Sequence, residues 1–221
     1  MVAKLLFMAK RARPDMLPVV SFLCTRSRMP TVQDWSKLKR AMNYLKKTKD
    51  ECLVLKWDGS GILHWYVDAA HAVHLDFRSH TGAVLFMGLG AVFSVSMKQK
   101  SNSRSSTESE LLAVDDVISN IMWTKYFLEA QGYEVKKNIM FQDNQSTMLL
   151  QKNGRASAGK RSRHLNVKLF CITDLINQKQ VEVVYCPTND MTADYFTKPL
   201  QGSKFDAHRQ RIMNAKRSTN N

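Results

Sequence analysis

The sequence lacks the cysteine patterns and long apolar runs that mark several classes of protein. Its four cysteines, Cys24, Cys52, Cys171 and Cys186, stand far apart and form no CxxC pair. Neither a zinc site nor a compact disulfide framework is therefore indicated. The longest apolar run, residues 82–95, is interrupted by glycines and too short to cross a bilayer, and the N-terminus has no signal-peptide pattern. We expect an intracellular chain, not secreted, with reduced cysteines and no membrane association.

Acidic residues are scarce relative to basic ones. The chain has 33 Lys and Arg against 19 Asp and Glu, a formal net charge of +14, which favours a polyanionic partner such as nucleic acid or an anionic membrane surface. Residues 1–50 hold 12 Lys and Arg against 3 Asp and Glu, residues 51–200 hold 16 against 15, and residues 201–221 hold 5 against 1. A near-neutral body is thus flanked by basic ends. A solvated basic surface without a partner is the alternative, but nucleic acid is favoured.

Hydrophobic spacing predicts two kinds of secondary structure in a chain with enough apolar residues for a packed core. Residues 1–50 have apolar residues at spacings of three and four, which predicts basic helices. From about residue 52 the pattern changes to β-type runs separated by turns, so we place a domain boundary there. We expect a frayed tail after Gln201. The predicted strands are 52–57, 62–67, 83–87, 91–97, 138–142 and 181–185, and the predicted helices are 107–131, 144–152, 164–178 and a short last one that carries Asp194.

This order of elements predicts an α/β fold with a layered sheet. After the short run 52–57 come three successive strands, and they are followed by a helix, a strand, one or two helices, a strand and a last helix. Successive strands form hairpins, whereas strands separated by helices are joined by crossovers. The sheet is therefore expected to be mixed, with helices packed against it.

Three aspartates stand where a ligand site could form. Asp68 ends a predicted strand, and small residues follow it. Asp143 lies between a strand and a helix, where open α/β sheets place ligands, although capping the helix is an equally good explanation for this residue alone. Asp194 by itself looks like an ordinary acid near a helix N-terminus. Singly, each is weak evidence for a site.

Two glutamates lie in the first turn of the long helix predicted at 107–131. Acids are common there because they suit the helix dipole. Glu110 lies in the same helical row as the apolar Val114 and Val117, whereas Glu108 lies in a more polar row. Helical periodicity therefore predicts that Glu110 leans toward the sheet.

These acids belong to six motifs that occur in a fixed order. With them the chain resembles the ribonuclease H region of copia-type LTR retrotransposon Pol polyproteins, over about residues 1–205. Residues 1–50 look like the end of the reverse transcriptase that precedes this nuclease, without the polymerase's own catalytic motifs. The motifs are YVDA at 66–69, RSHTG at 78–82, SSTESE at 105–110, QDNQS at 142–146, RHLNV at 163–167, and YCPT at 185–188 with ADYFTKPL at 193–200.

The resemblance implies a fold, an activity and a metal site. The fold would be ribonuclease H-like, with three antiparallel strands followed by parallel strands in one sheet flanked by helices. Asp68, Glu110, Asp143 and Asp194 would be the catalytic, metal-binding acids. Two divalent ions about 4 Å apart could activate water and stabilise the transition state of phosphodiester hydrolysis, and ligands made only of oxygen suit Mg²⁺ or Mn²⁺. The implied substrate is the RNA strand of an RNA–DNA hybrid.

The implied setting is reverse transcription, in an intracellular particle or the nucleus, with a reverse transcriptase domain in cis. We expect three parts: a basic helical segment at 1–50, the ribonuclease H-like domain at 51–200 and a basic tail at 201–221. Hybrid recognition relies on phosphate and 2′-hydroxyl contacts, although a solvated face is an equal alternative for the basic run 155–168. The candidate nucleic-acid-binding residues are Asn102, Arg104, Ser105, Asn144, Gln145, Lys160, Arg161 and Arg163.

Two other functions remain open at this point. One is an integrase-like nuclease of the same fold class, although the fourth acid and the Ala193–Asp194 context argue against it. The other is a degenerate, connection-like module that binds nucleic acid without cutting it. Retention of all four acids argues against decay.

Overall fold

The computed structural model of the chain describes residues 1–154 and 163–215, with the side chains of 163–167 left out. Its centre is a five-stranded sheet in the order β5-β3-β2-β6-β7. Strand β3 pairs antiparallel with both β2 and β5, whereas β6 and β7 run parallel to β2. This is the mixed, ribonuclease H-like sheet predicted above. The strands are β2 Ile62–Ala70, β3 His80–Phe86, β5 Ala91–Lys98, β6 Lys137–Gln142 and β7 Glu182–Tyr185.

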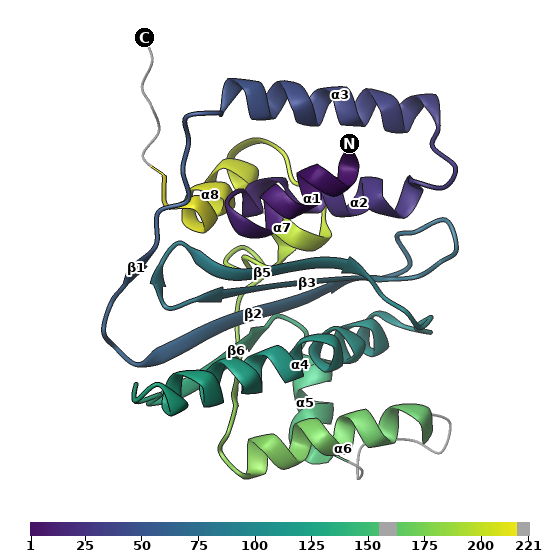
Figure 1. Cartoon of the computed structure of the whole chain (residues 1–221). Coiled ribbons are helices and arrows are strands. Elements are labelled where there is room, and N and C mark those ends of the chain that lie inside the picture. Colours follow the sequence, from purple (N-terminus) through teal and green to yellow (C-terminus); the bar gives the residue numbers. More distant parts are fainter. Residues whose placement is uncertain (155–162, 216–221) are drawn as a thin grey trace.

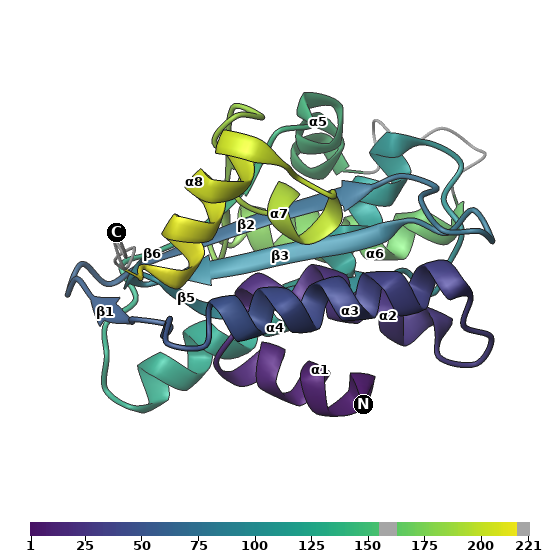
Figure 2. The ribbon, with the colours of Figure 1, turned by 90° about the horizontal axis from the view of Figure 1, so that it is seen from above.

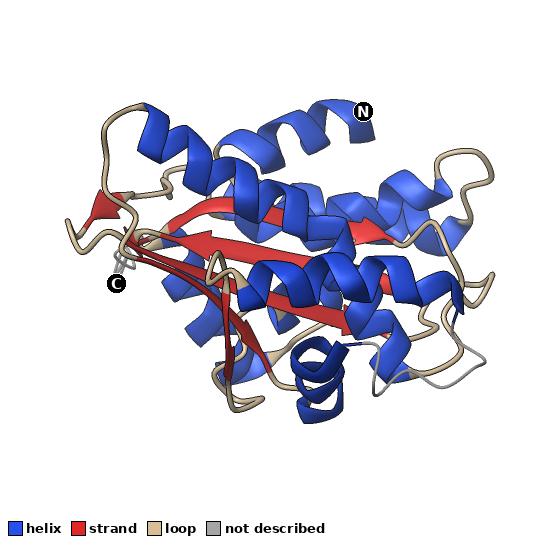
Figure 3. Cartoon of the chain, turned by 90° about the horizontal axis from the view of Figure 1, so that it is seen from below, coloured by secondary structure: helices blue, strands red, loops and turns tan. Residues whose placement is uncertain are grey.

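Helices cover both faces of this sheet (Figure 1). One face carries the long helix α4 with α5 and α6, which Figure 3 shows in front of the sheet. The other face carries the N-terminal helices and, beside them, the two C-terminal helices (Figure 2). The first group is α4 Ser106–Ala130, α5 Gln145–Asn153 and α6 Arg163–Asn177, and the second is α1 Val2–Arg11, α2 Leu17–Arg26, α3 Val32–Lys47, α7 Asp194–Thr197 and α8 Gly202–Met213.

The alternation of side chains along β2 divides the apolar residues between two cores. Trp65 and Val67 are fully buried in the cluster that includes residues of α4. Tyr66, which points to the opposite face, belongs to the cluster with residues of the N-terminal helices. Because successive strand residues point to opposite faces, one strand serves both layers.

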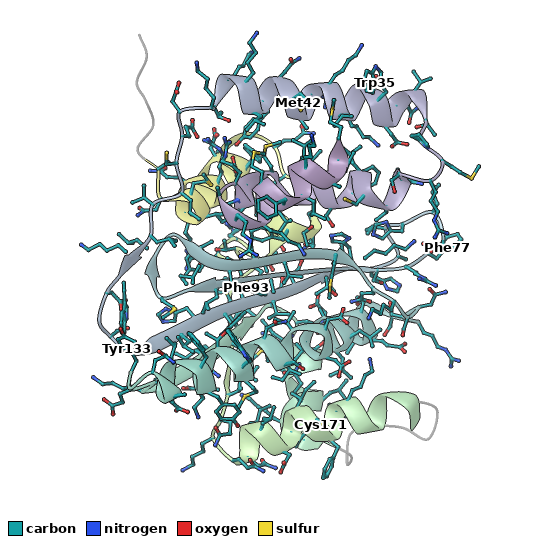
Figure 4. All side chains as sticks on the ribbon, viewed as in Figure 1. Trp35, Met42, Phe77, Phe93, Tyr133 and Cys171 are labelled. Carbon is teal, nitrogen blue, oxygen red and sulfur yellow. The ribbon has the colours of Figure 1, made fainter. Side chains whose placement is uncertain are left out.

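The N-terminal helices are packed onto the sheet. Val20 of α2 is fully buried in the same cluster as Val84 of β3. Helix α3 is the layer farthest from the sheet, and its Trp35 and Met42 remain exposed (Figure 4). The division of the chain into segments 1–50, 51–200 and 201–221 stays a prediction. No helix in the described part of the chain is long and apolar enough to span a membrane.

Two segments differ from their predicted structure. Only Lys56–Trp57 of the predicted strand 52–57 is a strand (β1), and it pairs with Gly88–Leu89 (β4) outside the main sheet. The reason is that the backbone N–H of Val54 donates to the Met213 carbonyl at 2.9 Å and so ties this segment to the C-terminal region. The expected frayed tail is instead helix α8 over Gly202–Met213, because Ile212 is fully buried.

Candidate active site

Three carboxylates meet at one edge of the sheet. Asp68 lies near the end of β2, and Asp143 directly follows the neighbouring parallel strand β6. Because the carboxyl ends of parallel strands share an edge, the two side chains converge. Glu110 reaches the same place from the first turns of α4. One potential ligand atom from each of Asp68, Glu110 and Asp143 lies within 4.8 Å of the others.

The two glutamates of α4 take different places, as the helix phase predicts. Glu110 joins the group of three carboxylates. Glu108 instead closes the helix N-terminus: its Oε2 accepts from the Arg104 backbone N–H at 2.7 Å, and its own N–H donates to Ser105 Oγ at 3.2 Å. Such contacts satisfy backbone groups that a helix start leaves unpaired. Glu108 therefore has a capping role.

Asp194 lies beside the three carboxylates but is not one of them. Its side chain on α7 is only 1% exposed. Lys198 Nζ lies 2.6 Å from its Oδ1 and Lys204 Nζ lies 2.9 Å from its Oδ2, so both oxygens bind lysines. Lys198 Nζ is also 3.5 Å from Asp68 Oδ2. A metal-ligand role for Asp194 stays a prediction.

Burial and mutual repulsion make Asp68 and Glu110 hard to ionise. Burial raises the pKa of Asp68 to about 6, with further upward contributions from the charges of Asp194 and Asp143 and an opposing one from Lys198. The pKa of Glu110 is raised well above its usual value, first by burial and then by the charges of Asp68 and Asp143. A positive charge among these oxygens would favour their ionised forms.

The donor set fits a hard divalent cation. All the converging atoms are carboxylate oxygens, which Mg²⁺ and Mn²⁺ prefer. Glu110 Oε2 is buried, and no hydrogen-bond partner for it exists in the described part of the chain. A buried charged oxygen without a partner is costly, and a metal ion would satisfy it.

Gly82 lets α7 lie against the sheet beside these acids. It stands directly opposite Asp68 in the β2–β3 register. A Cβ at this position would lie 2.6 Å from Thr197 Cγ2 and 2.9 Å from the Ala193 carbonyl oxygen. The close approach brings Thr197 near enough for its hydroxyl to donate a short hydrogen bond to Asp68 Oδ2. Only glycine leaves room for this contact.

A buried polar chain also holds α7 in place. Ser96 Oγ on β5 donates to the Phe196 carbonyl at 2.8 Å. The same oxygen lies 2.8 Å from His80 Nε2, and His80 Nδ1 lies 3.0 Å from His74 Nε2. Burial lowers the pKa of His80 to about 4. His80 is therefore neutral at pH 7 and structural.

Several predicted nucleic-acid-binding residues lie at two helix starts near the carboxylates. Ser105 caps α4, and Asn102 and Arg104 precede it in the same loop. Asn144 caps α5 by accepting from the Thr147 backbone N–H at 3.0 Å, and Gln145 is the first residue of that helix. Lys160 and Arg161 lie outside the described residues, and the side chain of Arg163 is not among those described. Contacts of all these residues with nucleic acid stay predictions.

Sequence reasoning missed the roles of Gly82, Thr197, Lys198 and Lys204. Three of them lie in recognised motifs, RSHTG and ADYFTKPL, so a signal was present. Their roles depend on how α7 and α8 pack, which spacing does not reveal. A cavity of about 700 Å³ between α2, α3 and residues 195–200 is lined in part by Thr197 and Lys198 but by none of the four predicted acids. The carboxylate cluster therefore lies beside this cavity and not in its lining.

Comparisons with known proteins give two kinds of similarity. No protein-family model matches the chain. The chain is 30% identical over 207 residues, 93% of its length, to the retrovirus-related Pol polyprotein from transposon TNT 1-94 of Nicotiana tabacum. It is 31% identical over 202 residues, 90% of its length, to that from transposon RE2 of Arabidopsis thaliana. The chain spans only 15% and 14% of these two polyproteins.

A solved structure similar to this chain is that of LC11-RNase H1, an enzyme isolated from compost by a metagenomic approach, in complex with an RNA/DNA hybrid. The superposition covers 61% of this chain and 93% of that one, with 14% sequence identity and a TM-score of 0.45.

Proposed function

Because this chain belongs to the copia-type Pol polyproteins, as a segment with a ribonuclease H-like structure, we propose that it hydrolyses the RNA strand of RNA–DNA hybrids during reverse transcription. The observation that carries the proposal is the group of three carboxylates, Asp68, Glu110 and Asp143, whose ligand atoms lie within 4.8 Å of one another. Asp194, buried beside Asp68, is proposed as the fourth acid.

These acids would hold two Mg²⁺ or Mn²⁺ ions. Bound divalent ions supply a nucleophilic water and positive charge for the transition state of phosphodiester hydrolysis. The chain contributes a rigid frame for the oxygens, since Asp68 and Glu110 are buried between the sheet and its helices. It also keeps the acids close enough to repel one another, which the pKa shifts of Asp68 and Glu110 reflect. The converging carboxylates therefore favour the binding of cations.

Substrate choice is proposed to come from the loops before α4 and α5. Arg104 and Asn144 lie at helix starts, where backbone N–H groups favour anions such as phosphate. Hydroxyl and amide groups such as those of Ser105 and Gln145 can bond 2′-hydroxyls, which distinguish RNA from DNA. Lys160, Arg161 and Arg163 would add phosphate contacts. The structural neighbour from compost is a complex with an RNA/DNA hybrid, and the same substrate is proposed here.

The proposed setting is an intracellular particle or the nucleus, with a reverse transcriptase domain in cis. In support, the relatives are Pol polyproteins, of which this chain spans a small part. Residues 1–50 are proposed to be the end of that domain, and residues 51–200 the nuclease.

The test is cleavage by the purified chain of a hybrid labelled in its RNA strand. We expect RNA cleavage with Mg²⁺ or Mn²⁺, none in EDTA, and no cleavage of duplex DNA. Asp143→Asn keeps the shape of the side chain but removes a charge, so it should abolish cleavage with an unchanged circular dichroism spectrum. Cleavage of duplex DNA would favour the integrase-like alternative. Hybrid binding without metal-dependent cleavage would favour the non-catalytic module.

A further inference from the structure

Lys198 lies within the acidic site and has no assigned role. It is the last residue before Pro199 and follows Asp194 by one helical turn. Its Nζ lies 2.6 Å from Asp194 Oδ1 and 3.5 Å from Asp68 Oδ2. Lys204 of α8 contacts only Asp194 among these acids. Of the two lysines, Lys198 is therefore the one that joins two of the proposed metal ligands.

The electrostatic situation of the two aspartates explains why a cation lies between them. The Asp68 and Asp194 side chains are each only 1% exposed. Two buried negative charges repel strongly unless a positive charge compensates them. The charge of Asp194 raises the pKa of Asp68, and the charge of Lys198 lowers it. Lys198 therefore offsets part of the repulsion within the site.

Lys198 also engages the oxygens that a divalent ion would need. Asp194 Oδ1 accepts from Lys198, and Asp68 Oδ2 has both Lys198 and the Thr197 hydroxyl as neighbours. An ammonium group and a divalent ion repel each other at such short range. A metal ion that binds Asp68 together with Asp194 must therefore displace the ammonium. The Lys198 side chain is 38% exposed and lines the adjoining cavity, so it has space to turn away.

We propose that Lys198 is a built-in cation of the active site that competes with divalent metal for Asp68 and Asp194. It holds the two carboxylates together, and it lowers the affinity of this edge of the site for metal. Lys198 is a positioning residue, since it acts through the metal ligands. The inference rests on the proposed function, because that proposal makes Asp68 and Asp194 metal ligands.

Binding of Mn²⁺ to the purified chain tests this, in the absence of nucleic acid. Free Mn²⁺ is followed by electron paramagnetic resonance in the wild type and in Lys198→Met, which keeps most of the stem but lacks the charge. We expect Lys198→Met to bind Mn²⁺ about tenfold more tightly, because one competing charge is gone. Lys198→Arg, which keeps the charge, should bind much as the wild type does. Most substitutions in a metal site weaken binding, so a gain separates this role from a merely structural one.

A matched control is Lys168→Met. Lys168 Nζ forms an ion pair with Asp115 Oδ2 at 2.7 Å, and both side chains are about one-third exposed. Removing this pair should leave Mn²⁺ affinity unchanged. If Lys198→Met fails to fold, Lys198→Gln is measured instead, since its amide can still donate to Asp194.

Thermal unfolding gives a second measurement. In EDTA the neutral Lys198 variant should unfold at a lower temperature than the wild type, because the repulsion between the aspartates is less compensated. Saturating Mn²⁺ should raise its unfolding temperature by more than it raises that of the wild type. Equal or weaker Mn²⁺ binding by the neutral variant would overturn the inference and leave the proposed function standing. Tighter binding by a chain that never cuts a hybrid would overturn the proposed function alone. If the wild type bound no Mn²⁺, both would fall.

Discussion

Glu110 and Glu108 are two residues apart in the first turns of α4, yet their environments are different. Glu110 Oε2 is buried without a hydrogen-bond partner in the described part of the chain, next to Asp68 and Asp143. Glu108 Oε2 accepts a hydrogen bond from the backbone N–H of Arg104. Glu110→Gln should therefore reduce hybrid cleavage by several orders of magnitude. Glu108→Gln should cost about 0.3–1 kcal/mol of stability through the helix dipole and leave cleavage nearly intact.

The two glutamate variants control each other, since each removes one charge from the same turn of one helix. Cleavage rates at saturating Mg²⁺ and urea unfolding measure the two effects separately. The reverse result, with a large loss of cleavage in Glu108→Gln only, would contradict the assignment of Glu110 to the metal site.

The raised pKa of Asp68 predicts how stability depends on pH without metal. Its pKa in the folded chain is about 6, against about 3.9 in an unfolded one. Because the folded value is the higher one, the contribution of Asp68 to stability is fully present below about pH 4. It is lost as the pH rises through about 6, by roughly 3 kcal/mol for a shift of two units.

Asp68→Asn removes this dependence. In EDTA, the free energy of unfolding of the variant minus that of the wild type should increase between pH 4 and pH 7. Groups such as His80 titrate in both proteins and cancel in the difference, which reports Asp68 together with its effect on the pKa of Glu110. A difference that stays constant over this range would mean that the carboxyl of Asp68 is not perturbed.

The residues whose position at the site could be predicted are those placed by a single element. Asp68 lies near the end of one strand, Asp143 follows another, and the helix phase distinguishes Glu110 from Glu108. Lys198 could not be found in this way, because its position depends on contact between α7 and β2, which are 124 or more residues apart in the sequence. Side-chain contacts between distant elements leave no periodic signal.

At the scale of elements, the contact between α7 and β3 fixes the positions of Asp194 and Thr197 relative to Asp68. Gly82→Ala would place a Cβ 2.6 Å from Thr197 Cγ2 and 2.9 Å from the Ala193 carbonyl. Both distances are shorter than real Cβ contacts allow, so α7 must move away from the sheet. The variant should lose hybrid cleavage and bind Mn²⁺ more weakly, because Asp194 and Thr197 shift relative to Asp68.

A double-mutant cycle separates this steric effect from a general loss of stability. Thr197→Ser removes the methyl group nearest to the new Cβ and keeps the hydroxyl that donates to Asp68. We expect Gly82→Ala with Thr197→Ser to recover part of the Mn²⁺ affinity that Gly82→Ala loses, a coupling typical of residues in contact. Purely additive effects in the cycle would argue that the contact does not position α7.

The elements themselves were largely predictable where periodicity was strong. The predicted helix 107–131 corresponds to α4, Ser106–Ala130, and the predicted strand 138–142 corresponds to β6, Lys137–Gln142. The exceptions have tertiary causes. Residues 52–55 are bound to the end of α8 through the Val54 N–H, and α8 gains its stability from burial of Ile212. Most residues of that helix are polar, and for this reason its sequence resembles that of a frayed tail.

At the scale of the whole molecule, the two basic ends of the chain meet on the same face of the sheet. Asp15, between α1 and α2, forms an ion pair with Arg13 at 2.7 Å and accepts from Tyr44 of α3 at 2.6 Å. Arg209 of α8 contacts the same Tyr44 hydroxyl, and Tyr195 donates to the Asp15 carbonyl at 2.9 Å. Deletion of residues 1–50 would therefore expose a buried polar network and part of the core. A deletion cannot separate nucleic-acid binding from folding.

Charge removal from α3 tests whether the basic N-terminal segment binds nucleic acid. Lys37, Arg40 and Lys47 are exposed on α3, and the first two line the cavity that Lys198 also lines. If all three contact phosphates, replacing them with Gln should reduce the slope of log affinity against log salt concentration for a hybrid by up to about 3. The loss should not depend on the sequence of the hybrid, because phosphate contacts carry no sequence information.

The matched control replaces Lys136, Lys137 and Lys179 with Gln, which removes the same net charge. These residues are exposed and lie just before or at the starts of β6 and β7, at the opposite end of the strands from Asp143. Because the Debye length is about 10 Å at 0.1 M salt, charges at that end act weakly on a hybrid bound at the carboxylates. An equal loss of slope in both variants would indicate that only net charge matters. A loss of slope confined to the α3 variant would show that the hybrid-binding surface runs from the carboxylates across the cavity to the N-terminal helices.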